Sequence, residues 1–353
     1  MKIAIDISPL NSGHYLQHRV RGTGFYLKNL KASLEKYHPE NKYIYFNRGD
    51  KLDPDVDVVH YPYFEPFFLT LPLFSKNKTV VTVHDLTPLV YPSHFESGIK
   101  GNIKWQIQKL ALNSVSGVIT DSQSSKKDII KYAGIPENKI KVVYLAAGSE
   151  FRILKDKEKE KENIIKKYNL PQEFILYVGD ATWNKNLPRL IKAVSKINVA
   201  VVMTGKALVQ DSVDANNPWN KDLIKVQELA KKNKDIFLPG FVSQDDLVAL
   251  YNSAGAFVMP SIYEGFGLPV LEAMSCGCPV IASRAGSLAE VAGEAIKHTD
   301  PFSVDSIAEG IKEVLGNPKL RQELSEKGLE QSKKFTWEKT AGETIEFYKS
   351  ISG

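Results

Sequence analysis

The feature that most constrains the fold is a series of short, continuous apolar runs that alternate with helical patterns along most of the chain. Strands that are buried on both faces have such unbroken apolar sequences, so the alternation predicts parallel sheets covered by helices on both sides. The predicted strands are residues 2–8, 56–62, 79–85, 116–122, 139–146, 174–180, 199–205, 235–241, 254–261 and 278–283.

The alternation is interrupted by the charged stretch KDKEKEKENIIKKY, residues 155–168, and then restarts. A chain of 353 residues is long enough for two domains. We therefore predict an α/β protein with two doubly wound, Rossmann-like domains, at 1–150 and 151–335, and a binding site in a central cleft between them. An amphipathic last helix is predicted at 336–353, with Thr336 as its N-cap.

The composition is that of a globular protein, with 43% hydrophobic and 25% charged residues. The first residues enter a strand pattern directly, and no apolar run is long enough to span a bilayer, so the sequence predicts a cytoplasmic protein without a signal peptide. Cys276 and Cys278 have no partner cluster of Cys or His, so we expect two reduced thiols and no metal site.

Charge is distributed unevenly along the chain. Residues 1–150 contain 19 Lys and Arg against 14 Asp and Glu, and this excess accounts for the whole net charge of +5. The excess indicates an anionic partner for the first domain. No nucleic-acid motif or dense basic stripe is present, so nucleic acid is not expected.

Residues 261–283, SIYEGFGLPVLEAMSCGCPVIAS, predict a glycine-rich turn that leads from a strand into a helix. Gly265 and Gly267 allow close approach of a ligand to the backbone, and Pro269 suits the first helical turn. The free N–H groups of such a helix start favour an anion, usually phosphate.

Two acids flank this turn, Glu264 and Glu272. Glu272 lies one turn into the predicted helix, where its carboxylate would repel phosphate but accept hydrogen bonds from sugar hydroxyls. Spacing alone also permits an ordinary strand-to-helix turn with two solvated acids.

The stretch EGFGLPVLEAMSCGCPVIAS resembles the signature of the retaining glycosyltransferases of family 4, the group 1 enzymes with the two-domain GT-B architecture. Further stretches resemble this family in the expected order over nearly the whole chain. They are RGTGFYLKNL at 21–30, VVTVHDLTPLVYP at 80–92, KVVYLAAGSEF at 141–151, YVGDATWNKNLPRLIKA at 177–193 and LPGFVSQDDLVALYNSAGAFVMPS at 238–261.

The resemblance implies an acceptor-side first domain, a second domain that binds a nucleotide-diphosphate sugar, and a C-terminal helix that crosses back to the first domain. It implies three catalytic side chains: Glu264 on the donor sugar, Lys185 on the departing diphosphate, and His84 near the sugar's primary hydroxyl or the acceptor. The implied donor-binding groups are Glu272 on the ribose, the main-chain N–H groups of Gly265, Phe266, Gly267 and Leu268, and the glycines Gly22 and Gly24 of the other domain.

The sequence departs from the family pattern in the phosphate loop, where many relatives carry an arginine at or shortly before the position of Asn184. Only Lys185 is cationic in DATWNKN. We expect either compensation by Arg19 or Arg21 of the other domain, or slower turnover. The loss of one charged hydrogen bond corresponds to about 1–3 kcal/mol.

The mechanism implied by the resemblance is retaining transfer of a hexosyl unit without a metal or a cofactor. Asp55 and Asp57 are interpreted as a polar lead into a strand, and no carboxylate nucleophile for a covalent intermediate is evident. Two other functions stay open, a sugar-nucleotide epimerase and a non-catalytic sugar-nucleotide-binding protein.

The expected acceptor is a glycan or a lipid-linked sugar. Residues 61–76 are rich in Phe, Tyr and Leu, and residues 100–113 place Ile103, Ile107, Leu110 and Ala111 at helical spacing beside Trp105 and three lysines. Apolar groups beside lysines suit an anionic membrane, so the first domain is predicted to contact the inner face of the membrane peripherally. Phe-rich segments of this kind also pack into the core or bind a partner subunit, and these alternatives stay open.

Overall fold

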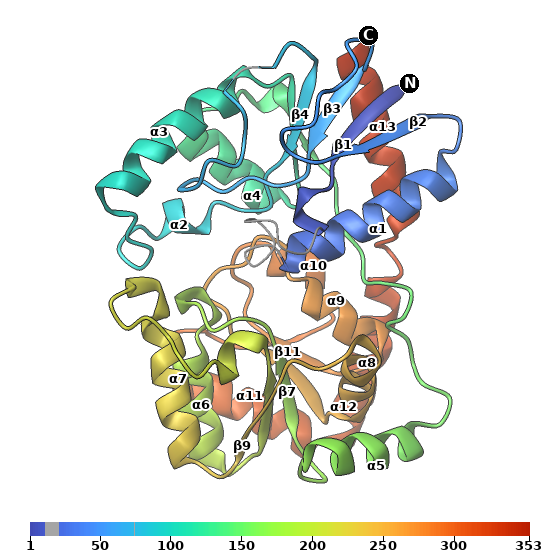
Figure 1. Ribbon diagram of the computed structural model, residues 1–353. Helices are drawn as coiled ribbons and strands as arrows, with labels where there is room; N and C mark the ends of the chain where they lie inside the picture. Colours follow the sequence, from blue (N-terminus) through green and yellow to red (C-terminus); the bar gives the residue numbers. More distant parts are fainter. Residues whose placement is uncertain (11–20, 74) are drawn as a thin grey trace. The chain divides into compact units, whose positions relative to one another are not determined.

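The computed structural model describes residues 1–10, 21–73 and 75–353 and divides the chain into two compact α/β units (Figure 1). Unit 1 comprises Met1–Ala146 and Phe335–Gly353, and unit 2 comprises Ala147–Lys334. The boundaries expected from the sequence were 150/151 and 335/336.

Unit 1 contains a six-stranded sheet in the order β2-β1-β3-β4-β5-β6, and every neighbouring pair is parallel. Its strands are β1 (Lys2–Asp6), β2 (Lys42–Phe46), β3 (Val58–Tyr61), β4 (Thr79–Thr82), β5 (Gly117–Thr120) and β6 (Ile140–Val142).

The helices of unit 1 are α1 (Arg21–Tyr37), α2 (Thr87–Val90), α3 (Gly98–Ser114), α4 (Gln123–Asp128) and α13 (Trp337–Ser352). Helix α13 packs beside α1, although it follows all of unit 2 in the sequence (Figure 1). The Thr336 side chain accepts a hydrogen bond from the Lys339 N–H, so the predicted N-cap is confirmed. The expected return of the C-terminal helix to the first domain is confirmed as well.

Unit 2 contains a second all-parallel sheet, in the order β12-β11-β10-β7-β8-β9. Its strands are β7 (Ile175–Val178), β8 (Val201–Thr204), β9 (Ile236–Gly240), β10 (Ala256–Met259), β11 (Val280–Ala282) and β12 (Lys297–His298). Its helices are α5 (Lys157–Tyr168), α6 (Leu187–Ile197), α7 (Lys221–Lys232), α8 (Gln244–Ser253), α9 (Leu268–Ser275), α10 (Leu288–Ala292), α11 (Val304–Gly316) and α12 (Pro318–Ser332).

The strand order of unit 2 determines where a ligand can bind. Read from β9, it is the 3-2-1-4-5-6 order of dinucleotide-binding sheets, in which the chain runs to one side after β7 and to the other side from β10. Ligands of such sheets bind at this switch point, outside the carboxyl ends of the strands. The relevant loops are 179–186, after β7, and 260–267, after β10.

The predicted two-sided burial of the strands is confirmed. Every residue of β4, β5, β8 and β10 is buried. Helix α6 covers its part of the sheet with Leu187, Leu190, Ile191 and Val194, which recur at the spacing of one helical face. All ten predicted strands are present in shortened form, whereas β2 and β12 were not predicted.

Candidate active site

An ion pair joins the two loops at the switch point of unit 2. The Lys185 Nζ lies 2.8 Å from both carboxylate oxygens of Glu264, and the Ser261 hydroxyl donates to the same carboxylate at 2.6 Å. Glu264 is only 6% exposed, so its carboxylate needs these donors to replace the hydrogen bonds of water. Two residues that the resemblance assigned to the sugar and to the diphosphate are therefore brought into contact.

Two asparagines hold the Lys185 loop against the Glu264 loop. The Asn184 side chain donates to the Tyr263 carbonyl at 3.0 Å, and the Asn186 side chain donates to the Pro260 carbonyl at 2.9 Å. Asn186 has a φ of 62°, a left-handed conformation that asparagine tolerates better than most residues. Asn184, which stands where many relatives are expected to have arginine, is buried and serves as a tie between the loops.

The loop after β11 supports Glu264 from behind. The Ser287 N–H and hydroxyl donate to the Glu264 carbonyl at 3.1 and 3.0 Å. Gly286 has a φ of +61°, and a Cβ there would lie 2.4 Å from the same carbonyl oxygen. Only glycine permits this close approach.

Helix α9 begins at the predicted glycine turn. Gly267 has a φ of +95°, Pro269 lies in the first turn, and no side chain caps the helix. Within residues 1–10, 21–73 and 75–353, the N–H groups of Gly267 and Leu268 donate no hydrogen bond. Gly265 and Phe266 lie buried just before them. This start of α9 can therefore bind an anion.

Glu272 lies one turn further along α9 and is 8% exposed. Burial raises the pKa of its carboxyl group to about 7, against the opposing effect of the Tyr251 hydroxyl, which donates to Oε2 at 2.9 Å. A carboxylate held in this way can accept hydrogen bonds from a vicinal diol.

His84 of unit 1 follows β4 and pairs with Asp121, which follows the neighbouring strand β5. The Nδ1 of His84 lies 2.6 Å from the Asp121 Oδ2. Burial alone would lower the pKa of His84, but Asp121, Asp85 and the Pro62 carbonyl together outweigh it, so the pKa is raised. The ring of Tyr26 packs edge-on against the His84 ring, with 4.9 Å between the ring centroids.

Gly22 and Gly24 lie in the first turn of α1 rather than in a loop before it. A Cβ at either position would meet no atom of the described residues within 4 Å, so packing within that part of the chain does not require glycine. Arg19 and the Arg21 side chain, the expected compensating cations, lie outside the residues that the structure describes.

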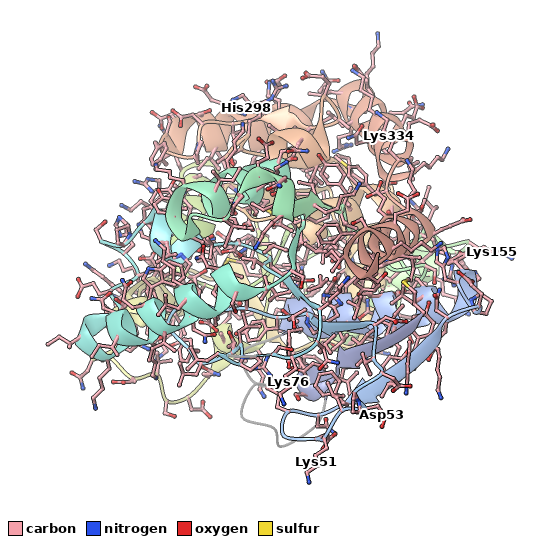
Figure 2. The ribbon with its side chains drawn as sticks, turned by 90° about the horizontal axis from the view of Figure 1, so that it is seen from above. Lys51, Asp53, Lys76, Lys155, His298 and Lys334 are labelled. Carbon is pink, nitrogen blue, oxygen red and sulfur yellow. The ribbon has the colours of Figure 1, made fainter. Side chains whose placement is uncertain are left out.

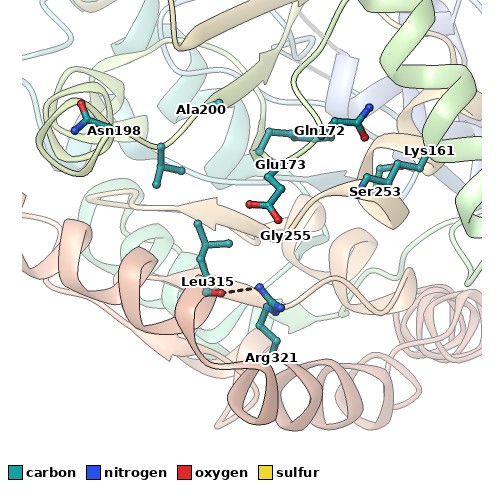
Figure 3. Close-up of a pocket in the computed structure, with 11 residues that line it drawn as sticks. Lys161, Gln172, Glu173, Asn198, Ala200, Ser253, Gly255, Leu315 and Arg321 are labelled. Carbon is teal, nitrogen blue, oxygen red and sulfur yellow. Dashed lines mark hydrogen bonds between the residues drawn. The ribbon is translucent and has the colours of Figure 1, made fainter.

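A cavity of about 430 Å³ lies at the amino ends of the unit 2 strands, opposite the switch-point loops. Phe174, Ala200 and Gly255, which line it, come immediately before β7, β8 and β10, and Arg321 closes one side by donating to the Leu315 carbonyl (Figure 3). Open α/β sheets bind ligands at the carboxyl ends of the strands, and no predicted site residue lines this cavity.

The acids before β3, which include Asp55 and Asp57 of the predicted polar lead into that strand, pair with Lys2. Asp53 and Asp55 form ion pairs with the Lys2 side chain, and Asp57 accepts a hydrogen bond from the Lys2 N–H. Asp53 lies at the surface of unit 1 (Figure 2). The described residues contain no group of three or more His, Cys, Asp or Glu that could hold a metal ion. Cys276 and Cys278 are buried and unbridged, as expected.

Sequence reasoning missed the residues that position the predicted ones, namely Asp121, Tyr251, Ser261, Gly286 and Ser287. Asp121 and Ser261 come just after predicted strand cores, so a survey of polar residues at the carboxyl ends of strands could have found them. Tyr251 lies inside α8 and gives no local signal.

Comparison with known proteins places both units in one family. The model of "Glycosyl transferases group 1" matches residues 155–331, and the model of "Glycosyltransferase Family 4" matches residues 20–147.

Two similar curated proteins come from Escherichia coli. The O-antigen chain mannosyltransferase B is 32% identical over 277 residues, which cover 78% of this chain and 71% of that protein. The serotype-specific mannosyltransferase WbdA is 32% identical over 270 residues, 76% of this chain. The match spans only 33% of the length of WbdA.

Two solved structures resemble this chain over 99% of its length. Sucrose-phosphate synthase from Thermosynechococcus elongatus has a TM-score of 0.77 at 19% identity, with 99% of that chain covered. The Anabaena protein HepE in complex with UDP-glucose has a TM-score of 0.70 at 18% identity, with 100% covered. At these identities the likeness shows the fold alone, which is GT-B, as predicted.

Proposed function

The chain belongs to the group 1 glycosyl transferases of glycosyltransferase family 4, and from this premise we propose that it transfers a hexosyl unit from a nucleotide-diphosphate sugar to a glycan or lipid-linked acceptor. The transfer retains the configuration at the anomeric carbon and needs neither a metal ion nor a cofactor. The observation that carries the proposal is the Lys185–Glu264 pair at the switch point of unit 2, in the loops that lead to the uncapped start of α9.

The donor-binding part of the proposal follows from this arrangement. The N–H groups at the start of α9 bind the diphosphate, Glu264 accepts hydrogen bonds from the sugar hydroxyls, and Glu272 accepts them from the ribose. Mannose is the first sugar to test because the E. coli relatives are named as mannosyltransferases. The UDP-glucose complex of the Anabaena protein supports a nucleotide-sugar donor.

In the proposed transfer, the bond between the anomeric carbon and the diphosphate oxygen breaks while the acceptor oxygen bonds to the same face of the sugar. The departing phosphate oxygen takes the proton of the acceptor hydroxyl. Negative charge grows on that oxygen in the transition state, so the fixed cation of Lys185 lowers the barrier. Glu264 supports the positive charge that develops near the anomeric carbon.

A donor screen tests the proposal directly. Thermal shifts against UDP-, GDP-, ADP- and dTDP-sugars identify the donor, and NMR of the product gives the configuration at the anomeric carbon. We expect one nucleotide class to stabilise the protein and the product to keep the donor's configuration. Tight binding without turnover would indicate a binding protein, and release of an epimerised sugar nucleotide would indicate an epimerase.

Two variants separate the proposed roles of the acids. Glu272→Ala should weaken donor binding in calorimetry, whereas Glu264→Ala should mainly lower the transfer rate. Glu294→Ala is the matched control, because the Glu294 side chain is 84% exposed at the surface of the same unit. Equal loss of nucleotide affinity in both site variants would contradict this division of roles.

Metal independence is tested with a chelator. The lack of a three-ligand acid, His or Cys cluster in the described part of the chain supports it. Excess EDTA should leave the transfer rate unchanged. A rate that EDTA abolishes and that Mg²⁺ or Mn²⁺ restores would refute this part of the proposal.

Peripheral membrane contact through unit 1 is supported by α3. Its Ile99, Ile103 and Leu110 share one helix face and are 80%, 56% and 69% exposed. The helix also carries Lys100, Lys104 and Lys109 and has no acidic residue. None of the described helices is long and apolar enough to cross a membrane. We propose that this face binds the anionic inner surface of the cytoplasmic membrane, where each lysine contributes about 1 kcal/mol.

Part of the predicted membrane surface belongs to the core instead. Trp105 and Ala111 of α3 are buried. In the aromatic stretch 61–76, Tyr61, Tyr63, Phe64, Phe67 and Leu71 are buried as well. These side chains provide the apolar burial of unit 1, so the prediction that the aromatic stretch faces the membrane was wrong for them.

Sedimentation with anionic liposomes tests the membrane contact. The protein should pellet at low salt, and Leu110→Ser should reduce pelleting, while Ile153→Ser on the surface of unit 2 should not. Absence of pelleting at low salt would contradict the proposal. Pelleting that high salt does not reverse would indicate apolar insertion rather than charge attraction.

A further inference from the structure

The His84–Asp121 pair is built into adjacent strand ends of unit 1. Strands β4 and β5 pair in parallel with Thr82 opposite Ile119, so their next residues leave the sheet side by side. The Val83 N–H donates to the Ile119 carbonyl and extends this pairing by one step. The 2.6 Å contact between Nδ1 and Oδ2 thus joins two side chains on backbones that are already fixed to each other.

A buried polar chain lies behind the His84 ring. The Tyr26 ring packs edge-on against it, and the Tyr26 hydroxyl lies 3.1 Å from the Thr82 hydroxyl. The Thr82 hydroxyl lies 2.8 Å from Nε2 of His60, and Nδ1 of His60 lies 2.6 Å from the Tyr348 hydroxyl. The polar chain therefore contains one side chain from each of four elements, namely α1, α13, β3 and β4.

The charged groups that face His84 favour its cationic form, against burial, which lowers the pKa of His84 and raises that of Asp121. Asp121 and Asp85 raise the pKa of His84, and so does the carbonyl group of Pro62, although Nε2 makes no well-formed hydrogen bond with the described residues. His60 is neutral, because burial and the charge of His84 lower the pKa of His60 to about 3. Burial raises the pKa of Tyr26, which therefore stays a neutral phenol.

We propose that Asp121 is a positioning residue for the transfer reaction: it fixes the His84 ring through Nδ1 and holds it as an imidazolium, so that His84 acts as a fixed positive charge and not as a proton acceptor. This inference rests on the proposed function for its kinetic consequence only. An imidazolium carries protons on both nitrogens and cannot accept another. The acceptor hydroxyl's proton therefore goes to the departing phosphate oxygen.

An NMR titration of His84 without any donor tests the positioning independently of the transfer reaction. In the wild type, the His84 ring should titrate above the usual 6.5. In Asp121→Asn, which keeps the size of the side chain but not its charge, the midpoint should fall by about one pH unit or more. Tyr348→Phe, at the far end of the polar chain, is the control and should leave it nearly unchanged. An unchanged midpoint in Asp121→Asn, or a wild-type midpoint below 6.5, would overturn the inference.

The pH profile of transfer tests the role of the charge. The imidazolium is lost as pH rises through its pKa, so the wild-type rate should fall on the alkaline side. In Asp121→Asn this fall should begin at lower pH, and kcat should drop about ten-fold with little change in the donor KM. Asp121→Glu should restore part of the loss. A rate that instead rises with deprotonation of His84 would show a general base and refute the inference, whereas absence of any transfer would refute only the proposed function.

Discussion

At the scale of single residues, Glu272 has a carboxyl group whose ionisation is opposed by burial. Its carboxyl group is buried, the Tyr251 hydroxyl lies 2.9 Å from it, and burial brings its pKa to about 7. The ionised form is the stronger acceptor for ribose hydroxyls. Near neutral pH, Glu272 is therefore a mixture of the ionised carboxylate and the protonated acid, and the donor encounters both forms.

Donor affinity should consequently depend on pH. Between pH 8 and pH 6 the protonated fraction of Glu272 rises, and donor affinity should fall about ten-fold if only the ionised form binds. Glu272→Gln should bind more weakly at pH 8 and should remove most of the pH dependence. Calorimetry of the donor complex at pH 6, 7 and 8 measures this. A wild-type affinity that does not change over this range would contradict the assignment of Glu272 to the ribose.

The same carboxyl group should reduce the stability of the fold at alkaline pH. Its pKa is raised from 4.5 to about 7 in the folded protein, so the folded state binds the proton more tightly than the unfolded state does. The stabilisation is present below pH 4.5 and is lost as pH rises through about 7. The loss corresponds to about 3 kcal/mol as an upper value. Glu272→Gln should therefore be more stable than the wild type in urea unfolding at pH 8.5, with the difference shrinking toward pH 5.

The individual site residues were more predictable than their partners. Glu264, Lys185 and Glu272 stand in motifs of adjacent residues, which the sequence displays directly. The Lys185–Glu264 pair joins residues 79 positions apart, and the His84–Asp121 pair joins residues 37 apart. Such pairs follow only from strand order and register, which local patterns do not determine.

At the scale of elements, the loop after β11 determines the position of Glu264. Gly286→Ala would place a methyl group 2.4 Å from the Glu264 carbonyl oxygen, in a left-handed conformation that disfavours alanine. We expect a loss of about 1–3 kcal/mol in stability together with reduced transfer. Gly316→Ala, at the end of α11, where a Cβ meets no atom of the described residues within 4 Å, is the matched control and should lower neither. Urea unfolding and a transfer assay measure both effects.

In the first turn of α1, a glycine-to-alanine substitution should not destabilise the fold, in contrast to Gly286→Ala. A Cβ at Gly22 meets nothing within 4 Å in the described residues, and alanine is the better helix former by about 1 kcal/mol. Gly22→Ala should therefore keep or raise the melting temperature. It should lower the transfer rate if this turn approaches the donor, as the family resemblance implies. Unchanged transfer in a stabilised Gly22→Ala variant would show that the glycine has no role in the site.

Elements were predictable where burial is two-sided. The strands with continuous apolar runs were all found in the structure, but β2 and β12 were missed. Strand β2 has partly exposed residues and begins with Lys42, and β12 is only two residues long at the edge of its sheet. Edge strands are buried on fewer sides, so their sequences carry a weaker apolar signal.

At the scale of the whole molecule, the two units have separate cores, so damage to one should stay local. Tyr348→Phe removes the hydroxyl beside Nδ1 of His60, which is fully buried, and should cost about 1–2 kcal/mol. Hydrogen exchange should accelerate in β3, β4 and α13 and stay unchanged in β7 and β10. Ser350→Ala, at an exposed position of α13, is the control. Equal acceleration in unit 2 would show that the units unfold together.

The architecture of the whole chain was predictable from the restart of the strand pattern after a charged stretch, because each doubly wound sheet needs its own series of apolar runs. The switch point was not predictable, since strand order is decided by which faces pack together rather than by any one segment.

The place of α13 in unit 1 has a consequence for biosynthesis. A ribosome makes residues 1–146 first, but α13, which supplies Tyr348 to the polar chain behind His84, emerges only after all of unit 2. Unit 2 is a continuous segment and can fold as soon as it is made. The second unit of the sequence is thus able to reach its native state before the first, and the nascent first unit leaves the surface that α13 will cover open to chaperones until α13 has emerged.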